Sequence, residues 1–123
     1  MANPNIAAVT SILGTTTYYT PSGTAAVVLL PNAAASGTVF KINQIYVSNV
    51  DGTAADSVTV TVRSAVASTP TTATIVKGIS IPANSTLEVF SAPFYLKEDQ
   101  DIQVVGVAAS GDLEAVSTWE EIS

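Results

Sequence analysis

Residues branched at Cβ dominate this chain: Val, Ile and Thr make up one third of its 123 residues and are spread along its whole length. Branching at Cβ restricts side-chain rotation in a helix and suits the pleated surface of a sheet. The clearest segment is 57–65, where Val58, Val60 and Val62 alternate with more polar residues. Alternation with a period of two is typical of a strand that turns one face to a core. The sequence therefore predicts an all-β fold.

Clusters of Gly, Pro, Asn, Asp and Ser divide the chain into short apolar segments. Such spacing is typical of antiparallel sandwiches and barrels. We expect one antiparallel β-sandwich domain over residues 1–123, jelly-roll or immunoglobulin-like, with eight or nine strands and an extended N-terminal arm at 1–5. The expected strands cover 6–13, 15–19, 24–30, 38–48, 57–65, 73–81, 86–90, 101–107 and 112–122.

Three segments depart from simple alternation. Between 38 and 48 the apolar positions change phase, which predicts a bulge near Asn43 and Gln44. The strand over 73–81 is expected to be irregular near Gly78. Every residue from Ala25 to Leu30 is apolar, so both faces of that strand are hydrophobic. Either this strand is central and covered on both sides, or one face lies in a subunit contact.

The composition argues against most catalytic and nucleic-acid-binding functions. The chain has no cysteine and no histidine, which removes thiolate nucleophiles and imidazole bases or ligands. Its net charge is −6 with only four basic residues, whereas phosphate contacts need clustered Lys and Arg. No apolar run approaches the about 18 residues of a membrane span. We therefore expect no enzyme activity, no cofactor, and no nucleic-acid or membrane partner.

Two acidic turns could supply oxygen ligands to a calcium ion. One contains Glu98, Asp99 and Asp101, and the other contains Asp51 and Asp56. The first turn lacks the ligand spacing of a calcium loop, and in the second Asp-Gly at 51–52 is a strong turn signal. We therefore interpret both segments as solvated turns and expect no metal site.

Two further groups of residues have a functional and a structural interpretation. A glycosidase would need a pair of carboxylates, and the candidates are Glu88, Glu114, Glu120 and Glu121. An aromatic platform for sugar stacking would draw on Tyr18, Tyr19, Phe94, Tyr95 and Trp119. We interpret the carboxylates as solvent-facing charges and the aromatic rings as core and interface packing.

Several runs in the chain resemble small virion structural proteins of tailed phages, particularly cyanophages and other marine phages. The runs are 1–6, 40–53 (FKINQIYVSNVDGT), 79–89 (ISIPANSTLEV), 94–102 (FYLKEDQDI), 112–116 (DLEAV) and 120–122 (EEI). The resemblance covers nearly the whole chain and consists of strand and turn patterns without catalytic motifs. It implies a structural component of the particle, such as a capsid decoration (cement) protein or a neck, tail or fibre part.

These observations together predict a capsid decoration protein that binds the major capsid protein on the outer surface of the virion after synthesis in the host cytoplasm. We expect a homo-oligomer, with a trimer favoured. The expected contact residues are Val9, Ile12, Leu13, Val27, Val28, Leu29 and Leu30. The alternatives are a neck, tail or fibre component, or a carbohydrate-binding β-sandwich module.

Overall fold

Two antiparallel sheets form the protein, which confirms the predicted all-β sandwich. The computed structural model describes residues 8–20, 24–64, 70–90, 92–107 and 112–123. The predicted arm at 1–5, the start of the first predicted strand at Ile6 and the turn at 21–23 lie outside the described residues. The strands are β1 (Ile12–Tyr19), β2 (Val27–Asn32), β3 (Val39–Asn49), β4 (Asp56–Ser64), β5 (Thr71–Ile81), β6 (Thr86–Glu88), β7 (Phe94–Leu96), β8 (Gln100–Gly106) and β9 (Leu113–Ile122).

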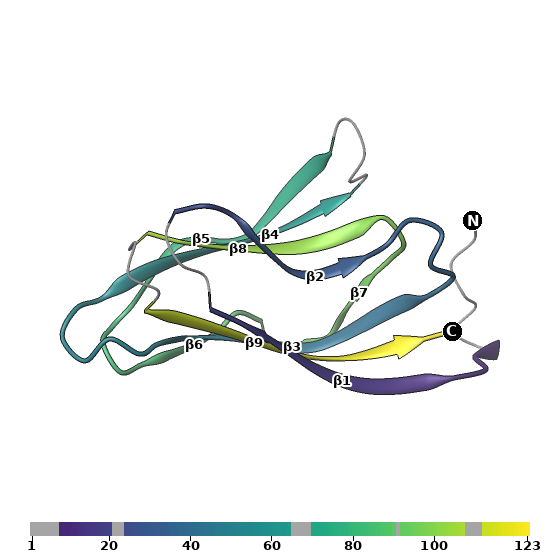
Figure 1. Ribbon diagram of the computed structural model, residues 1–123, viewed down its shortest axis with the longest axis horizontal. Helices are drawn as coiled ribbons and strands as arrows, with labels where there is room; N and C mark the ends of the chain where they lie inside the picture. Colours follow the sequence, from purple (N-terminus) through teal and green to yellow (C-terminus); the bar gives the residue numbers. More distant parts are fainter. Residues whose placement is uncertain (1–7, 21–23, 65–69, 91, 108–111) are drawn as a thin grey trace.

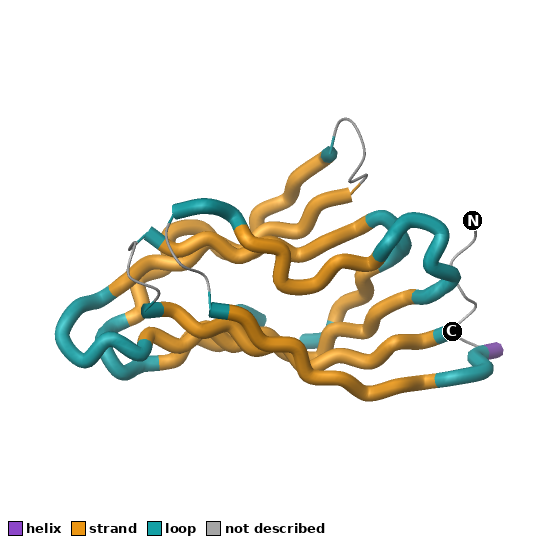
Figure 2. The backbone as a smooth tube through the Cα atoms, viewed as in Figure 1, coloured by secondary structure: helices purple, strands orange, loops and turns teal. Residues whose placement is uncertain are grey.

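The strand order identifies the sandwich as a jelly roll. One sheet has the order β1-β9-β3-β6, with β7 also beside β3, and the other has the order β2-β8-β4-β5. The two sheets form separate layers in Figure 1, and in Figure 2 the loops gather at the two ends. Strands β8 and β9 insert between earlier strands, which produces the two interleaved Greek keys of a jelly roll. An immunoglobulin sandwich would pair the first two strands within one sheet, whereas here β1 and β2 lie in different sheets.

The core lies between the two sheets and is built from alternate residues of their inner faces. Its completely buried side chains are Ile42, Ile45 and Val47 on β3, Val58 and Val60 on β4, Leu96 on β7 and Ile102 on β8. On β3 the pairing with β9 shifts between Ile42 and Gln44, which confirms the predicted bulge. Asn43 is the extra residue of the bulge. It shifts the alternation of the strand by one position, so that the apolar side chains before and after it all face the core.

Strand β2 corrects the sequence prediction in three ways. It is an edge strand, which excludes the first of the two alternatives, a central strand covered on both sides. It also continues through Pro31 and Asn32, which were expected to end it. Leu29 and Leu30 are both buried, because a bulge between Val28 and Leu30 lets consecutive side chains enter the core.

Two further elements differ from the predicted strands. Gly14 was expected to separate two strands, yet it lies inside β1 and pairs with Glu120 of β9. Backbone pairing continues through it because glycine can adopt extended geometry, although it packs no side chain. The expected strands do not include Phe94 to Leu96, but this segment pairs with β3 as a short strand.

The adjoining ends of β4 and β5 rise away from the other strands in Figure 1. The pairing of the two strands shifts twice, and Gly78 adopts a φ of 60°, which confirms the predicted irregularity. Bulges increase local twist and bend a strand pair. An apolar hollow of about 190 Å³ lies beside β4 and β5 and is lined by Val62, Ile75, Phe90, Ala92 and Phe94.

Two buried asparagines link the sheets. At the end of β2, the Nδ2 of Asn32 donates a hydrogen bond to the carbonyl of Leu96 in the other sheet, at 3.1 Å. At the end of β3, the Nδ2 of Asn49 donates to the carbonyl of Ile81 in the opposite sheet, at 2.9 Å. The two side chains are 1% and 2% exposed. Each buried amide therefore has a hydrogen-bond partner in the opposite sheet.

The hydroxyl of Ser117 is the exception among these buried polar groups. Its side chain is fully buried on the inner face of β9 opposite Ile45, and its Oγ has no hydrogen-bond partner. An unsatisfied buried hydroxyl opposes folding, so Ser117→Ala should raise the free energy of unfolding by about 1 kcal/mol. Urea denaturation of both proteins measures this difference. A loss of stability in the variant would mean that the hydroxyl is bonded.

Candidate functional site

The strand edge of β1 is the most exposed apolar feature of the described fold. Ile12, Leu13 and Tyr18 are 58%, 60% and 78% exposed, and Tyr19 is also exposed. Ile12 and Tyr18 point to the outer face, and Leu13 and Tyr19 point to the inner face. All eight residues of β1 are uncharged, and none is proline. The strand therefore offers apolar side chains on both faces and a row of backbone groups along its free edge.

The other sheet edges carry features that oppose strand addition. Strand β2 contains Pro31 and is bulged at Leu29. Strand β5 contains Lys77, two pairing irregularities and the positive φ of Gly78. Strands β6 and β7 have only three residues each. Prolines, bulges, lysines and short length are the devices by which proteins blunt sheet edges, so β1 is the one long, flat edge among the described strands.

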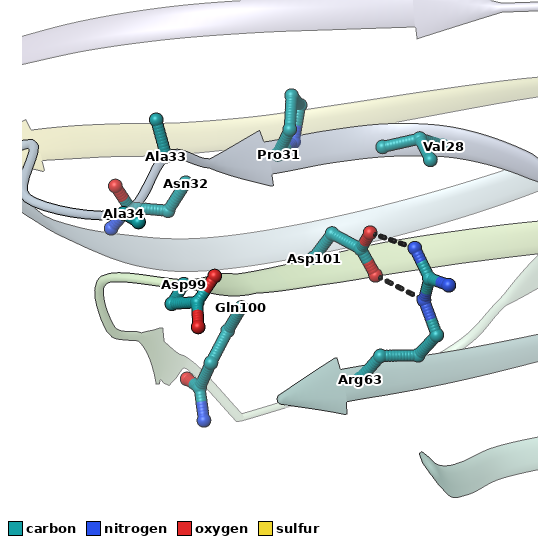
Figure 3. A pocket seen from close by; sticks show the side chains of 9 residues that line it. All are labelled: Val28, Pro31, Asn32, Ala33, Ala34, Arg63, Asp99, Gln100 and Asp101. Carbon is teal, nitrogen blue, oxygen red and sulfur yellow. Dashed lines mark hydrogen bonds and ion pairs between the residues drawn. The ribbon is translucent and has the colours of Figure 1, made fainter. Parts of the chain in front are cut away.

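A hollow of about 420 Å³ lies on the outer face of the second sheet, beside β2. Figure 3 shows Val28 and Pro31 at its margin and the Arg63–Asp101 pair at its base. Ala33 and Ala34, from the loop after β2, also line it. The hollow therefore combines an apolar margin with the Arg63–Asp101 pair and with the acidic side chain of Asp99.

The ion pair in this hollow joins two neighbouring strands. Arg63 of β4 lies opposite Asp101 of β8, and its Nε donates to Asp101 Oδ1 at 2.9 Å while its Nη2 contacts Oδ2. The Asp101 side chain is 3% exposed and that of Arg63 is 22% exposed. The hydrogen bond to Asp101 raises the pKa of Arg63 above its usual value. The guanidinium is therefore a fixed, charged partner of the buried carboxylate.

The carboxylates of the first acidic turn are directed to different partners. Asp101 pairs with Arg63, whereas Glu98 accepts a hydrogen bond from the backbone N–H of Gly37 at 2.8 Å. Asp99 adopts a φ of 60°, a conformation typical of a tight turn. Within the described ranges, no group of three Asp or Glu residues could hold a metal ion.

Of the second acidic segment, only the part around Asp51 is a turn, whereas Asp56 is the first residue of β4 and is buried. Asp51 Oδ1 accepts hydrogen bonds from the N–H and the hydroxyl of Thr53, at 2.7 and 2.9 Å. These bonds lower the pKa of Asp51, because they stabilise its ionised form. Asp56 accepts a hydrogen bond from the N–H of Ser57 at 2.7 Å. The turn interpretation of Asp51-Gly52 is confirmed.

The four glutamates considered for glycoside hydrolysis do not share one face. Glu88, Glu114 and Glu120 lie on the outer face of the first sheet, and Glu121 has the opposite orientation. Glu88 accepts a hydrogen bond from the Gln44 side chain at 2.7 Å.

The aromatic residues are also divided between the two faces. Tyr18 and Tyr95 are exposed on the outer face of the first sheet. Phe94 and Trp119 instead pack against the core. The Trp119 ring lies 4.3 Å from that of Phe40, and its Nε1 donates to Thr17 Oγ1 at 3.0 Å. The five aromatic residues therefore do not form one sugar-stacking platform.

The predicted contact residues have unequal exposure. Ile12, Leu13 and Val28 are exposed, and Val9 and Val27 are half-buried. Leu29 and Leu30 belong to the hydrophobic core, so their side chains are not available to a partner. Tyr18, Tyr19 and the Arg63–Asp101 pair were not among the predicted contact residues. The uncharged run through β1 could have identified the tyrosines, but the ion pair joins residues far apart in the sequence.

No helix in the described part of the chain is long and apolar enough to cross a membrane. Comparisons of the chain with protein-family models, with curated proteins and with solved structures find no match.

Proposed function

We propose that this protein is a virion structural protein of a tailed phage, and that it acts as a capsid decoration protein on the outer surface of the shell. The proposal starts from the sequence resemblance described above. The structural observation that supports it is the exposure of apolar side chains at two separate places, Ile12 and Leu13 on β1 and Val28 beside the hollow on β2. Exposed apolar surface of this kind marks contacts with other proteins. The jelly roll also occurs in viral capsid proteins, an analogy of fold that supports the proposal without establishing it.

The proposed mechanism is mechanical. The hollow beside β2 contacts the major capsid protein, with Val28 and Pro31 buried against neutral surface and Arg63 already neutralised by Asp101. Binding then leaves Arg63 beside the carboxylate with which it is already paired. Because each decorated subunit adds the same modest contact, the stabilisation of the shell is distributed over many copies.

The abundance of the chain in purified particles tests the proposed location. Quantitative mass spectrometry should give a ratio to the major capsid protein near one, as expected for a protein that covers the shell. A few copies per particle would instead assign the protein to the neck, tail or fibres. Absence from particles would overturn the proposal.

A lysine in the hollow tests the proposed contact. Val28→Lys should weaken binding to undecorated particles at least tenfold, because an unpaired ammonium is costly to bury in an apolar contact. Val107→Lys is the matched control, since Val107 is 63% exposed and lies outside the hollow. Co-sedimentation with particles measures binding, and circular dichroism confirms that both variants fold. Equal binding of the two variants would exclude the hollow as the contact.

A further inference from the structure

We propose that the edge of β1 pairs with β1 of a second copy of this chain. The two strands run antiparallel about a two-fold axis and join the two β1-β9-β3 sheets into one continuous sheet. The inference goes beyond the proposed function, because it states what the purified chain does in the absence of any particle. It names a partner for the one strand edge that the described fold leaves open.

The first argument is the contrast between β1 and the other edges. Strand β1 has eight residues with no proline and no charge, and it pairs with β9 without a register shift. No described strand pairs with its other side, where N–H and C=O groups follow each other in a regular row. Such an edge is a template for strand addition, and proteins usually blunt edges that are not used. The other edges here are blunted by Pro31, by Lys77 and Gly78, or by short length.

The second argument is electrostatic and favours a second copy as the partner. The chain carries a net charge of −6, so most contacts between two copies bring carboxylates together. Strand β1 contributes no charge, and the nearest carboxylates of the sheet are on β9, at Glu114, Glu120 and Glu121. Across a β1–β1 contact the two β9 strands are three strand spacings apart, about 14 Å. This separation exceeds the screening length of about 8 Å at physiological salt.

The third argument is the self-complementarity of the strand. With Thr16 on the axis, Gly14 lies opposite Tyr18 of the second copy, and Leu13 lies opposite Tyr19 of the second copy. Residues that lie opposite each other then point to the same side of the joined sheet. The outer and inner faces therefore continue from one copy to the other. A tyrosine ring beside a glycine covers the backbone that glycine leaves exposed. Each of these pairs occurs twice because the contact is two-fold.

A two-fold contact of this kind closes on two chains. It therefore predicts a dimer, where the sequence analysis had favoured a trimer. Sedimentation velocity of the purified full chain should give a mass of two copies of 12.6 kDa.

Charged substitutions of Thr16, one positive and one negative, test the proposed position of the two-fold axis. Thr16 is exposed on the outer face, so substitution there should leave the fold intact. Thr16→Lys and Thr16→Glu should each raise the dissociation constant of the dimer at least tenfold, because like charges face each other across the axis. An equal mixture of the two variants should form a heterodimer. Thr74→Lys, on the exposed edge strand β5, is the control and should remain a dimer.

A cysteine cross-link provides a second test that does not depend on the charged variants. The chain has no cysteine, so one introduced residue reports one position. Opposed Cα atoms in an antiparallel pair lie about 4.5 to 5.5 Å apart, within the range of a disulfide. Thr16→Cys should therefore form a covalent dimer on oxidation. Tyr18→Cys should not, since the two Tyr18 positions lie about 14 Å apart along the strands.

A wild-type chain that sediments as a single copy at every attainable concentration would overturn the proposal. So would dimers that survive in both charged variants, or an oxidised Thr16→Cys protein that remains a single chain. If the chain is present on particles but does not dimerise in solution, this inference is wrong and the proposed function stands. A dimer in solution with the chain absent from particles would support this inference and overturn the proposed function.

Discussion

Leu30→Ala is expected to lower the free energy of unfolding by about 3 kcal/mol. Leu30 is 1% exposed and belongs to the hydrophobic core, where truncation removes buried methyl groups and leaves a cavity. The variant distinguishes between two roles for the apolar run in β2. A residue of a subunit contact would be exposed in the separate chain, and its truncation would hardly change stability. Urea denaturation with an unchanged m-value measures the difference.

The neighbouring residue provides the control. Val28 lies on the same strand and is 38% exposed, so Val28→Ala should change stability by no more than about 0.5 kcal/mol. Equal effects of the two substitutions would contradict the assignment of Leu30 to the core and Val28 to the surface.

Asn49→Ala is expected to cost about 3 kcal/mol of stability, from three hydrogen bonds at about 1 kcal/mol each. The Nδ2 of Asn49 donates to the carbonyls of Ala54 and Ile81, both at 2.9 Å. Its Oδ1 accepts from the N–H of Asp51 at 3.0 Å. Alanine leaves these groups without their partners at a site where Asn49 itself is only 2% exposed. Thermal and urea denaturation both measure the loss.

Gln44→Ala is the matched control, because the Gln44 amide hydrogen-bonds to Glu88 at an exposed position. It should change stability by no more than about 0.5 kcal/mol. Asn32→Ala, in the other link between the sheets, should be additive with Asn49→Ala, since the two sites share no partner. A fully stable Asn49→Ala protein would mean that water replaces the side chain.

The features predicted correctly from the sequence are those with local causes. The phase change between Ile42 and Ile45 is visible within one strand, and the structure places a bulge there. Gly78 is a residue that tolerates positive φ, and β5 is irregular at that position. Asp51-Gly52 forms a turn through hydrogen bonds between residues two positions apart. Each of these predictions needed only the chemistry of a few consecutive residues.

The features that the sequence did not reveal depend on residues far apart in the chain. Jelly-roll and immunoglobulin-like sandwiches have similar strand patterns, and only the insertion of β8 and β9 between earlier strands separates them. Asn32 was interpreted as the end of a strand because asparagine favours turns. Its partner, the carbonyl of Leu96, lies 64 positions away in the sequence.

The candidate site was predictable only in part, because some of its features have local causes and others depend on distant residues. The exposure of Ile12 and Leu13 follows from the place of β1 at a sheet edge, and the sequence assigned both residues to a contact surface. Leu29 and Leu30 were assigned to that surface because every residue from Ala25 to Leu30 is apolar, so that regular alternation would leave one apolar face outside the core. The bulge between Val28 and Leu30 breaks this rule and brings both leucines into the core.

The unequal sheet edges also limit how far these molecules can associate through backbone pairing. Growth of a filament by strand addition requires each molecule to offer two open edges, one to the molecule before it and one to the molecule after it. Among its described strands this protein offers one, because Pro31, Lys77 and the three-residue strands blunt the others. Strand addition can therefore join two molecules and then stops. We therefore expect a chain this rich in Val, Ile and Thr to resist fibre growth by strand addition.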